Sequence, residues 1–322
     1  MIKVSICCTV YNHERYLRDA LEGFVKQKTN FGYEVIVHDD ASTDGSAQII
    51  REYEHKYPDI IKPIYQTENQ HSKGVPIGTN FIYPKMSGEY IALCEGDDYW
   101  TDETKLQQQV DFLDAHSDYV ACVHNSVKLD LWHGTSEEMY HRDSDCDLTF
   151  ADVIPGGSAC FHTSSLMYRR WLRNDLPQYM RKRGRGFGDY PMAIYLATMG
   201  KIRYINKPMS VYRWGAVGSY TMVTSSSMEK MLKIYEKIDQ LLADVDQETG
   251  GKYSDLIRPV KLQNLYTMTE RKGDYPALRK EPLKSIYDSQ SWRYKLKIYV
   301  LQYSGPLGKA FLEYQRKKLV RK

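Results

Sequence analysis

The sequence lacks long apolar runs, paired-cysteine motifs and an excess of either charge. No segment approaches the roughly 20 apolar residues that a membrane-spanning helix needs, and the short strand-like stretch after Met1 soon turns polar. We therefore expect no signal peptide and a cytoplasmic location. No C-x-x-C pair occurs among the six cysteines, which are expected to be reduced core thiols rather than zinc ligands or disulfides: Cys7, Cys8, Cys94, Cys122, Cys146 and Cys160.

The composition is that of ordinary globular protein. Its 322 residues, 42% hydrophobic and 26% charged, can form one large or two modest domains, and the net charge of +3 gives no reason to expect nucleic acid as a partner. The charge is uneven, because residues 283–322 carry ten Lys or Arg against Asp288 and Glu313, interleaved with aromatic residues. This tail fits either peripheral contact with an anionic membrane surface or a helical lid packed on the protein or on another subunit.

The hydrophobic pattern of the first part of the chain alternates between strand and helix. Strand-like runs occur at 4–10, 34–38, 60–65, 89–94 and 119–127, and helical spacing occurs at 14–28, at about 45–57 and in a segment with Leu106, Val110 and Leu113. Such alternation predicts an α/β fold in which helices flank a mainly parallel sheet and ligands bind at the strands' carboxyl ends. Further on we expect a loop at 133–147, a strand at 159–168, a glycine-rich segment at 181–188 and helices at 228–242 and 256–271.

A cluster of carboxylates follows one of these strands. Glu95, Asp97 and Asp98 lie within four positions directly behind residues 89–94. Three acids so close repel one another at neutral pH, and an oxygen-binding divalent metal would relieve that repulsion while attracting a phosphate ligand. The plain alternative is an exposed acidic turn that caps the helix beginning near Asp102.

Three other groups of polar residues occur where a strand gives way to a helix. Asp39 and Asp40 precede the Ser-Thr-Asp-Gly segment 42–45, and a carboxylate there can accept hydrogen bonds from a ribose or base, although helix capping by Ser42, Thr43 or Asp44 explains the motif equally well. Residues 9–12, Thr-Val-Tyr-Asn, end the first strand where backbone amides could meet a nucleotide. Asp189 lies two residues before Pro191 and is either a helix cap or a general base.

Together these motifs resemble the inverting family-two glycosyltransferases with the GT-A fold, over roughly residues 4–219. The resemblance rests on Val-Ser-Ile before Tyr11-Asn12, Asp39-Asp40 before Ser-Thr-Asp-Gly, Gly88-Glu-Tyr-Ile before Glu-Gly-Asp97-Asp98-Tyr-Trp, and Gly-Asp189-Tyr-Pro. Additional similarities are Lys-Leu-Gln-Gln-Gln-Val from Lys105, His-Thr-Ser-Ser-Leu-Met-Tyr-Arg from His162, and Gly200-Lys-Ile-Arg-Tyr-Ile running into Met209-Ser-Val-Tyr-Arg213.

The resemblance implies a metal-dependent, inverting hexosyltransferase with a Rossmann-like GT-A sheet over residues 1–220 and a helical C-terminal extension at 221–322. The nucleotide-sugar half would cover about 1–127 and the acceptor half about 128–220. A UDP-sugar is the expected donor, and the expected acceptor is a growing surface glycan, in a polysaccharide, a lipid-linked oligosaccharide or a glycoprotein. Oligomerisation is compatible with the sequence.

The resemblance also implies roles for single residues. Asp189 would be the catalytic base, and Asp98 with Asp97 would bind Mn²⁺ or Mg²⁺. The residues expected to bind the nucleotide are Thr9, Val10, Tyr11, Asn12, Asp40, Asn80 and Asp97.

Two departures from the family pattern leave an alternative open. The acidic motif opens with Glu95 where Asp is more usual, and no histidine follows Tyr212-Arg213, where the chain reads Trp214-Gly215. Because the family often uses that histidine as a metal or diphosphate ligand, a water or another side chain would have to replace it. The rival interpretation is a non-catalytic nucleotide-sugar-binding or scaffold subunit, and a nucleotide-sugar hydrolase is a third.

Overall fold

The structure is a computed structural model that describes residues 1–156, 160–181, 189–216, 227–303 and 305. The chain divides into two compact units, Met1–Ser219 and Tyr220–Lys322, and each is described by itself. Residues 182–188 of the predicted glycine-rich segment 181–188 lie outside the described residues, as do residues 304 and 306–322 of the basic tail. Within the described part of the chain, no helix combines the length and apolar character needed to cross a membrane.

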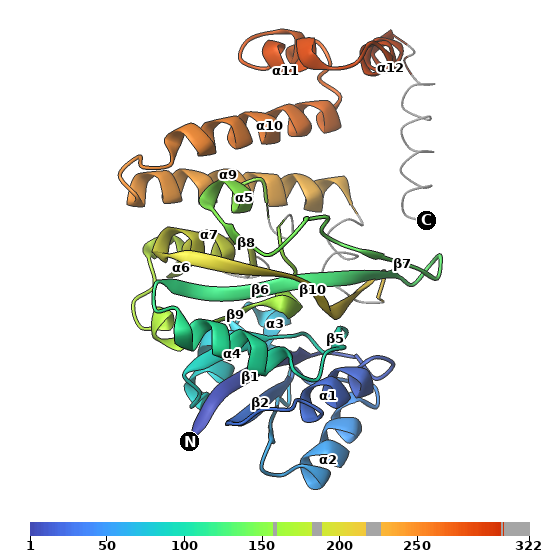
Figure 1. Cartoon of the computed structure of the whole chain (residues 1–322). Coiled ribbons are helices and arrows are strands. Elements are labelled where there is room, and N and C mark those ends of the chain that lie inside the picture. The colour runs from blue at the N-terminus through green and yellow to red at the C-terminus, as the bar shows by residue number, and fades with distance from the viewer. Residues whose placement is uncertain (157–159, 182–188, 217–226, 304, 306–322) are drawn as a thin grey trace. The chain divides into compact units, whose positions relative to one another are not determined.

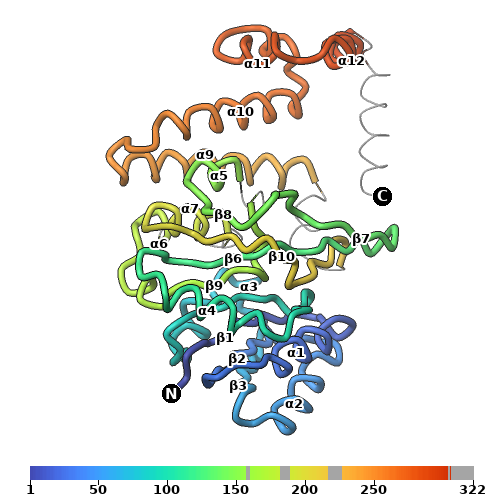
Figure 2. Tube along the Cα trace, in the orientation of Figure 1, coloured from blue at the N-terminus to red at the C-terminus, as the bar shows by residue number. Residues whose placement is uncertain are grey.

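The first unit is built on one mixed sheet flanked by helices (Figures 1 and 2). Its strands are β1 (Ile2–Val10), β2 (Gly32–Asp39), β3 (Ile61–Tyr65), β4 (Tyr90–Leu93), β5 (Tyr99–Trp100), β6 (Tyr119–Asp130), β7 (Thr135–Glu138), β8 (Cys146–Leu148), β9 (Met167–Arg169) and β10 (Lys201–Trp214). The order along the sheet is β3-β2-β1-β4-β9-β6-β10-β5, while β7 pairs with β6 and β8 with β10.

Parallel pairing joins the long strands and antiparallel pairing the short ones. The strands β3, β2, β1 and β4 are mutually parallel, as are β6 and β10, whereas β5, β7, β8 and β9 run antiparallel to their neighbours. The predicted α/β fold class is therefore confirmed. The carboxyl ends of β1, β2 and β4 meet at one edge, which is where ligands bind in sheets of this kind.

The helices of this unit range from the short polar α3 to the almost fully buried α7. They are α1 (Leu17–Val25), α2 (Ser46–Lys56), α3 (Gln70–Lys73), α4 (Lys105–Ala115), α5 (Phe150–Val153), α6 (Gln178–Arg181) and α7 (Asp189–Met199). A π-turn covers Gly78–Ile82, and 3-10 turns cover Tyr83–Lys85, Thr163–Ser165 and Arg170–Arg173. In α1 the apolar residues fall on the face that is buried, namely Leu17, Ala20, Leu21 and Phe24. They pack on the alternate, inward-facing residues of β1 and β2 in one core.

Two predictions were wrong in the middle of the chain. The polar segment 133–147, expected as a loop, contains β7 and the start of β8, because the long strands β6 and β10 offer edges with which even polar backbone can pair. The strand expected at 159–168 is reduced to β9, and the Thr163–Ser165 turn precedes it. Hydroxyl side chains there hydrogen-bond locally, which competes with strand pairing.

In its described residues the second unit is helical, and its first two helices confirm the helices predicted at 228–242 and 256–271. It contains α9 (Met228–Glu248), α10 (Ser254–Lys272), a 3-10 turn (Ala277–Arg279), α11 (Lys284–Ser289) and α12 (Trp292–Tyr303). The helices α9 and α10 pack along each other (Figure 1). A small core joins α10, α11 and α12 through Tyr266, Tyr275, Leu278, Leu283, Ile298 and Leu301.

Candidate functional site

The acidic turn is attached to the end of β1 by the backbone. The amide of Cys94 donates to the carbonyl of Cys7 at 3.1 Å, and the amide of Gly96 donates to that of Thr9 at 3.0 Å. A Cβ atom on Gly96 would lie 2.9 Å from both His13 Nδ1 and Val10 Cγ2, so only glycine lets the turn approach β1 this closely. These contacts place the three carboxylates at the carboxyl edge of the sheet.

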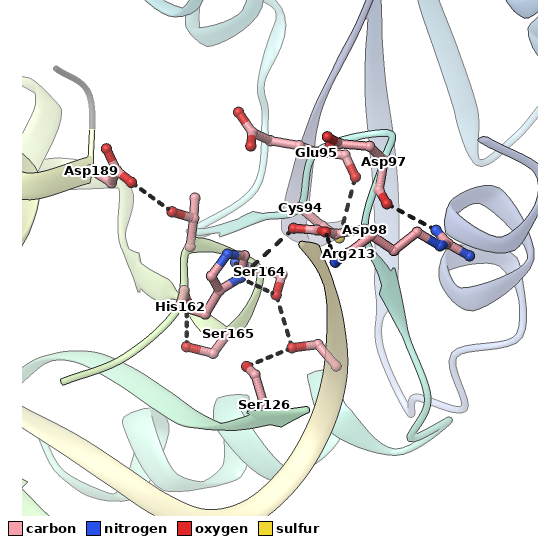
Figure 3. Close-up of polar contacts among 12 residues, drawn as sticks. Cys94, Glu95, Asp97, Asp98, Ser126, His162, Ser164, Ser165, Asp189 and Arg213 are labelled. Atoms are coloured by element: carbon pink, nitrogen blue, oxygen red, sulfur yellow. Dashed lines mark hydrogen bonds and ion pairs between the residues drawn. The ribbon is translucent and has the colours of Figure 1, made fainter. Parts of the chain in front are cut away.

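Glu95, Asp97 and Asp98 form one group of potential metal ligands. One carboxylate oxygen from each lies within 4.8 Å of the others, and no further group of this kind occurs in the described part of the chain (Figure 3). Asp97 and Asp98 are buried, whereas Glu95 is exposed. Desolvation and the charge of Asp97 raise the pKa of Asp98 well above its usual range.

Glu95 is affected by the same crowding. Desolvation, followed by the charges of Asp97 and Asp189, raises the pKa of Glu95 to about 8. Because Glu95 is exposed, the repulsion by the two aspartates is the part that we expect to persist in water. Three oxygen donors that repel one another match the preference of a hard divalent cation, and the residues present therefore fit such an ion.

Arg213 holds the acidic turn from β10. Its backbone amide donates to Asp98 Oδ1 at 2.9 Å, and its Nη1 donates to the carbonyl of Asp97 at 2.9 Å. The guanidinium also pairs with Asp19 on α1 and stacks on the rings of Tyr16 and Tyr99. Figure 3 shows Arg213 reaching across the turn that carries Asp97 and Asp98. One buried arginine thus connects α1, the turn and β10.

His162 is a site residue to which the sequence assigned no role. Its Nδ1 lies 3.8 Å from Asp98 Oδ2, and its ring stacks on Tyr212 at 4.4 Å between ring centroids. The backbone amide of Ser164 donates to this Nδ1, so the nitrogen carries a lone pair and Nε2 carries the proton. Burial lowers the pKa of His162 to about 4, which keeps the ring neutral. The imidazole lies between Asp98 and Asp189 in Figure 3.

A network of serine hydroxyl groups holds the His162 ring in place by hydrogen bonds. Ser164 Oγ lies 2.9 Å from His162 Nδ1 and 2.8 Å from Ser210 Oγ, which in turn lies 2.9 Å from Ser126 Oγ. All three serines are fully buried. The indole of Trp100 adds a hydrogen bond to the carbonyl of Ser164 at 2.8 Å. Buried networks of this kind hold a side chain in one orientation.

The predicted base lies on the other side of the site. Asp189 is the first residue of α7, it is exposed, and its Oδ2 accepts from Thr163 Oγ1 at 3.3 Å. Thr163 follows His162 directly, so the hydrogen bond connects α7 to the segment beside Asp98. The residue that would precede Asp189 as a helix cap lies outside the described residues. Asp189 contributes to the raised pKa of Glu95, which places its charge close to the acidic group.

The residues predicted to bind the nucleotide lie on β1, β2 and the segments after them. Thr9 and Val10 end β1, and Tyr11 follows with 45% of its surface exposed. Asn12 adopts a φ of 58°, and its Oδ1 accepts from the amide of Thr43 at 2.7 Å, which joins the ends of β1 and β2. Asn80 lies in the Gly78–Ile82 turn and is exposed.

Asp40 has protein partners that the sequence did not suggest. Its two carboxylate oxygens accept from the amides of Gln70 and His71, at 2.8 and 2.9 Å. It therefore anchors the start of α3 beside the end of β2. Each oxygen retains a second lone pair, so contact with a ribose or base remains compatible with this arrangement.

Comparison with known proteins identifies the family. The family "Glycosyl transferase family 2" matches residues 5–176. Protein Rv1520 of Mycobacterium tuberculosis is 36% identical over 223 residues, which cover 67% of this chain and 60% of the relative. The poly(ribitol-phosphate) beta-N-acetylglucosaminyltransferase TarS of Staphylococcus aureus is 33% identical over 259 residues, or 78% of this chain and 42% of TarS. The chain thus spans less than two thirds of the length of these relatives.

Solved structures show the same fold. Residues 1–349 of S. aureus TarS in complex with UDP-GlcNAc give a TM-score of 0.56 at 19% identity, with 84% of this chain and 81% of that chain covered. The mannosyltransferase PcManGT of Pyrobaculum calidifontis, in complex with GDP-Man and Mn²⁺, gives 0.57 at 17% identity, with 99% and 85% covered. The GT-A fold predicted from the motifs is confirmed, and the chain belongs to glycosyl transferase family 2.

Proposed function

We propose that this protein is a metal-dependent, inverting glycosyltransferase that moves a sugar from a UDP-sugar to a hydroxyl group of a growing surface glycan. The observation that carries the proposal is the acidic turn with Asp97 and Asp98 at the carboxyl edge of the sheet, opposite Asp189 on α7. The solved complexes of TarS with UDP-GlcNAc and of PcManGT with GDP-Man and Mn²⁺ support a nucleotide-sugar donor and a divalent ion.

Asp98 and Asp97 would hold the ion, with Glu95 as a third oxygen donor. When bound, the ion would neutralise the charge that builds on the departing nucleoside diphosphate. Arg213 keeps both aspartates in place, because it donates to Asp98 Oδ1 and to the carbonyl of Asp97. Thr9, Val10, Tyr11, Asn12, Asp40 and Asn80 would contact the uracil and ribose.

Asp189 would act as the general base. In an inverting transfer the acceptor oxygen bonds to the anomeric carbon, the bond from that carbon to the diphosphate oxygen breaks, and a carboxylate takes the acceptor's proton. Asp189 is exposed and anchored by Thr163, so an incoming hydroxyl can reach it. The acceptor would be a polysaccharide, a lipid-linked oligosaccharide or a glycoprotein glycan.

His162 would replace the histidine that is missing after Arg213. The Nε2–H group of the neutral His162 ring can donate a hydrogen bond to a diphosphate oxygen. His162 lies beside Asp98 and therefore next to the proposed ion site. The Ser164, Ser210 and Ser126 hydroxyls fix the ring in that orientation.

The test is calorimetric binding of UDP in saturating Mn²⁺. We expect Asp98→Ala to abolish metal-dependent binding, because the phosphates' charge is left uncompensated. We expect His162→Phe to weaken binding by roughly 10- to 100-fold, the usual effect of losing one hydrogen bond to a charged group. Asp111→Ala removes a carboxylate that bonds Gln107 on the surface of α4, and should bind UDP as the wild type does. Unchanged UDP affinity in Asp98→Ala would contradict the metal assignment.

Turnover separates the proposed enzyme from its rivals. The wild type should release UDP from a UDP-sugar only when a glycan acceptor is present. A non-catalytic subunit, the alternative that the missing histidine suggests, would bind UDP with Mn²⁺ and release nothing with any acceptor. Release of free sugar without an acceptor would identify a hydrolase.

A further inference from the structure

Helix α12 (Trp292–Tyr303) has two apolar faces, and within the described part of the chain only one of them is covered. Ile298 and Leu301 are buried in the small core that α12 shares with α10 and α11. Five large residues of the same helix are exposed by more than half of their surface: Trp292 (69%), Leu296 (53%), Tyr299 (56%), Val300 (51%) and Tyr303 (64%). We call these five residues the α12 stripe.

The spacing of the α12 stripe places its members on a single side of the helix. At about 100° per residue, positions 292, 296, 299, 300 and 303 fall within roughly 100° of arc, while 298 and 301 point the opposite way. Tyr299 and Tyr303 contact each other, with ring centroids 4.7 Å apart. Because Ile298 and Leu301 fix the rotation of α12, the stripe is directed away from the core that holds the helix.

Cations border the stripe on both sides. By the same helical geometry Arg293 flanks one edge and Lys295 the other. The Arg293 guanidinium lies 5.6 Å from the Trp292 ring, and Lys295 Nζ donates to the carbonyl of Asp288. The sequence after α12 adds six more Lys or Arg and one Glu over residues 304–322. An apolar stripe with interfacial aromatics and cationic borders is typical of helices that lie in the plane of a membrane surface.

The charges beside the α12 stripe indicate whether it binds a second copy of the chain or a lipid surface. A second copy of the chain would bring Arg293 and Lys295 against the same cations of its partner, and like charges in apposition cost energy. An anionic lipid surface presents the opposite charge to these borders and an apolar layer to Leu296 and Val300. Trp and Tyr side chains suit the headgroup layer, since an apolar ring carries a polar tip. We propose that α12 docks this protein on an anionic lipid surface, with the α12 stripe inserted at the headgroup boundary.

The proposal goes beyond sugar transfer and is tested without an activity assay. The intact chain is sedimented with vesicles of phosphatidylcholine alone or with 30% phosphatidylglycerol, at 0.1 M and 1 M salt. We expect binding to the anionic vesicles at 0.1 M salt and much less at 1 M, because the Debye length falls from ~10 Å to ~3 Å. Absence of binding to anionic vesicles at 0.1 M salt would overturn the proposal.

Two double variants test the stripe itself. Leu296→Ser with Tyr299→Ser should lower partitioning to anionic vesicles at least tenfold, because two inserted apolar groups are lost. Leu256→Ser with Leu265→Ser is the matched control, since both leucines are exposed, at 39% and 44%, on α10 of the same unit. Equal partitioning of the two variants would overturn the proposal, provided that circular dichroism shows equal helix content. If the helix contents differ, quenching of Trp292 fluorescence by brominated lipids decides whether α12 inserts.

Trp292 offers a direct measure of insertion. Lipids brominated near the headgroup should quench the part of the fluorescence that Trp292→Phe removes, and should leave the part due to the other tryptophans unchanged. Quenching that is the same in the wild type and in Trp292→Phe would overturn insertion at α12. A concentration-dependent dimer that the stripe variant dissociates, together with no vesicle binding, would instead identify a second copy as the occupant.

Discussion

At the scale of single residues, the surroundings of a side chain decide how readily it takes up or releases a proton. Asp189 illustrates how two interpretations of one carboxylate can be separated. A capping role needs only an acceptor oxygen, which an asparagine also provides, whereas a general base must take up a proton. The hydrogen bond from Thr163 is compatible with both roles, and a substitution that keeps the acceptor oxygen but removes the basicity separates them.

For this reason we expect Asp189→Asn to keep UDP affinity in Mn²⁺ and to lose sugar transfer by roughly 100-fold or more, the typical value of a positioned base. Steady-state kinetics with a saturating donor measure the loss in kcat, and calorimetry checks the binding. Thr163→Val serves as a comparison, because it removes the anchoring hydroxyl and leaves the carboxylate. Transfer near the wild-type rate in Asp189→Asn would make Asp189 a structural residue.

Lys105 is a second residue with altered chemistry. It is fully buried at the start of α4, where its Nζ donates to Gln109 Oε1 at 2.7 Å and lies 3.9 Å from the Trp100 ring centroid. Desolvation lowers the pKa of Lys105 to about 7 against the opposing effects of Cys94, Cys122 and Asp102. In the unfolded chain the pKa of lysine is near 10.4, so between pH 7 and 10 the unfolded state binds more protons.

The free energy of unfolding should therefore rise with pH through this window, because the proton that Lys105 must lose on folding is released at less cost as the pH approaches the pKa of the unfolded chain. Between pH 6 and pH 8 we expect this group to contribute about 1 kcal/mol, and Lys105→Met should remove that contribution. Urea unfolding of both proteins at the two pH values measures the difference. The control is Lys201→Met, which changes an exposed lysine paired with Asp118 and should leave the pH dependence of the unfolding free energy as in the wild type. A wild-type pH dependence in Lys105→Met would contradict the prediction.

At the scale of elements, close packing of α1 on β5 positions the acidic turn. A Cβ atom on Gly23 would lie 2.8 Å from the carbonyl oxygen of Trp100 and 3.1 Å from its nitrogen. Both are backbone atoms, which cannot move aside as a flexible side chain can. β5 directly follows Asp97 and Asp98 and is held against β10 by the pairs Ser210 with Trp100 and Val211 with Tyr99. A displacement of β5 is therefore transmitted to the acidic turn.

We predict that Gly23→Ala destabilises the protein by about 1–3 kcal/mol, the usual cost of overpacking. The result is diagnostic because alanine in a helix normally adds up to about 1 kcal/mol of stability relative to glycine. Chemical denaturation measures the free energy of unfolding, and UDP binding in Mn²⁺ should weaken in the same variant. An increase in stability would mean that β5 can move aside without cost, and would contradict the inference that the packing of α1 on β5 positions the acidic turn.

The secondary structure was predictable where each element carries its own signal. The parallel strands near the N-terminus are apolar runs, and α1, α2 and α4 have apolar residues at helical spacing. By contrast, β7 reads Thr-Ser-Glu-Glu, and all four of its residues are exposed. Its pairing with β6 supplies the hydrogen bonds that make it a strand, so no local pattern could predict it.

At the scale of the whole molecule, each of the two compact units has a hydrophobic core of its own, one in the sheet domain and one among the C-terminal helices. All the residues proposed to bind the donor belong to the first unit. A ligand stabilises the structure that it binds, by about 2.7 kcal/mol at 100 times its dissociation constant. Stabilisation by a UDP-sugar should therefore be concentrated in Met1–Ser219.

Hydrogen exchange can measure this distribution. With UDP and Mn²⁺ we expect slower amide exchange at the carboxyl ends of β1 and β2 and in the turn at 95–98, and unchanged exchange in α10 and α12. The Asp98→Ala variant under the same conditions should show no slowing in either unit. Protection that rises equally in α10 would indicate that the donor site is coupled to the helical unit.

The sequence by itself determined the α/β class, the family and the acidic group, because these depend on local periodicity and on residues that are neighbours in the chain. Only the tertiary structure brought His162 and Arg213 to Asp98, since Arg213 is 115 residues away and reaches the carboxylate only when β10 lies beside β5. The tertiary structure also shows that the carboxylate of Asp40 accepts hydrogen bonds from amides of α3. It shows, too, which apolar residues of α12 are buried and which are exposed. Contacts between distant segments and burial depend on how the elements pack, which the order of residues along one element does not reveal.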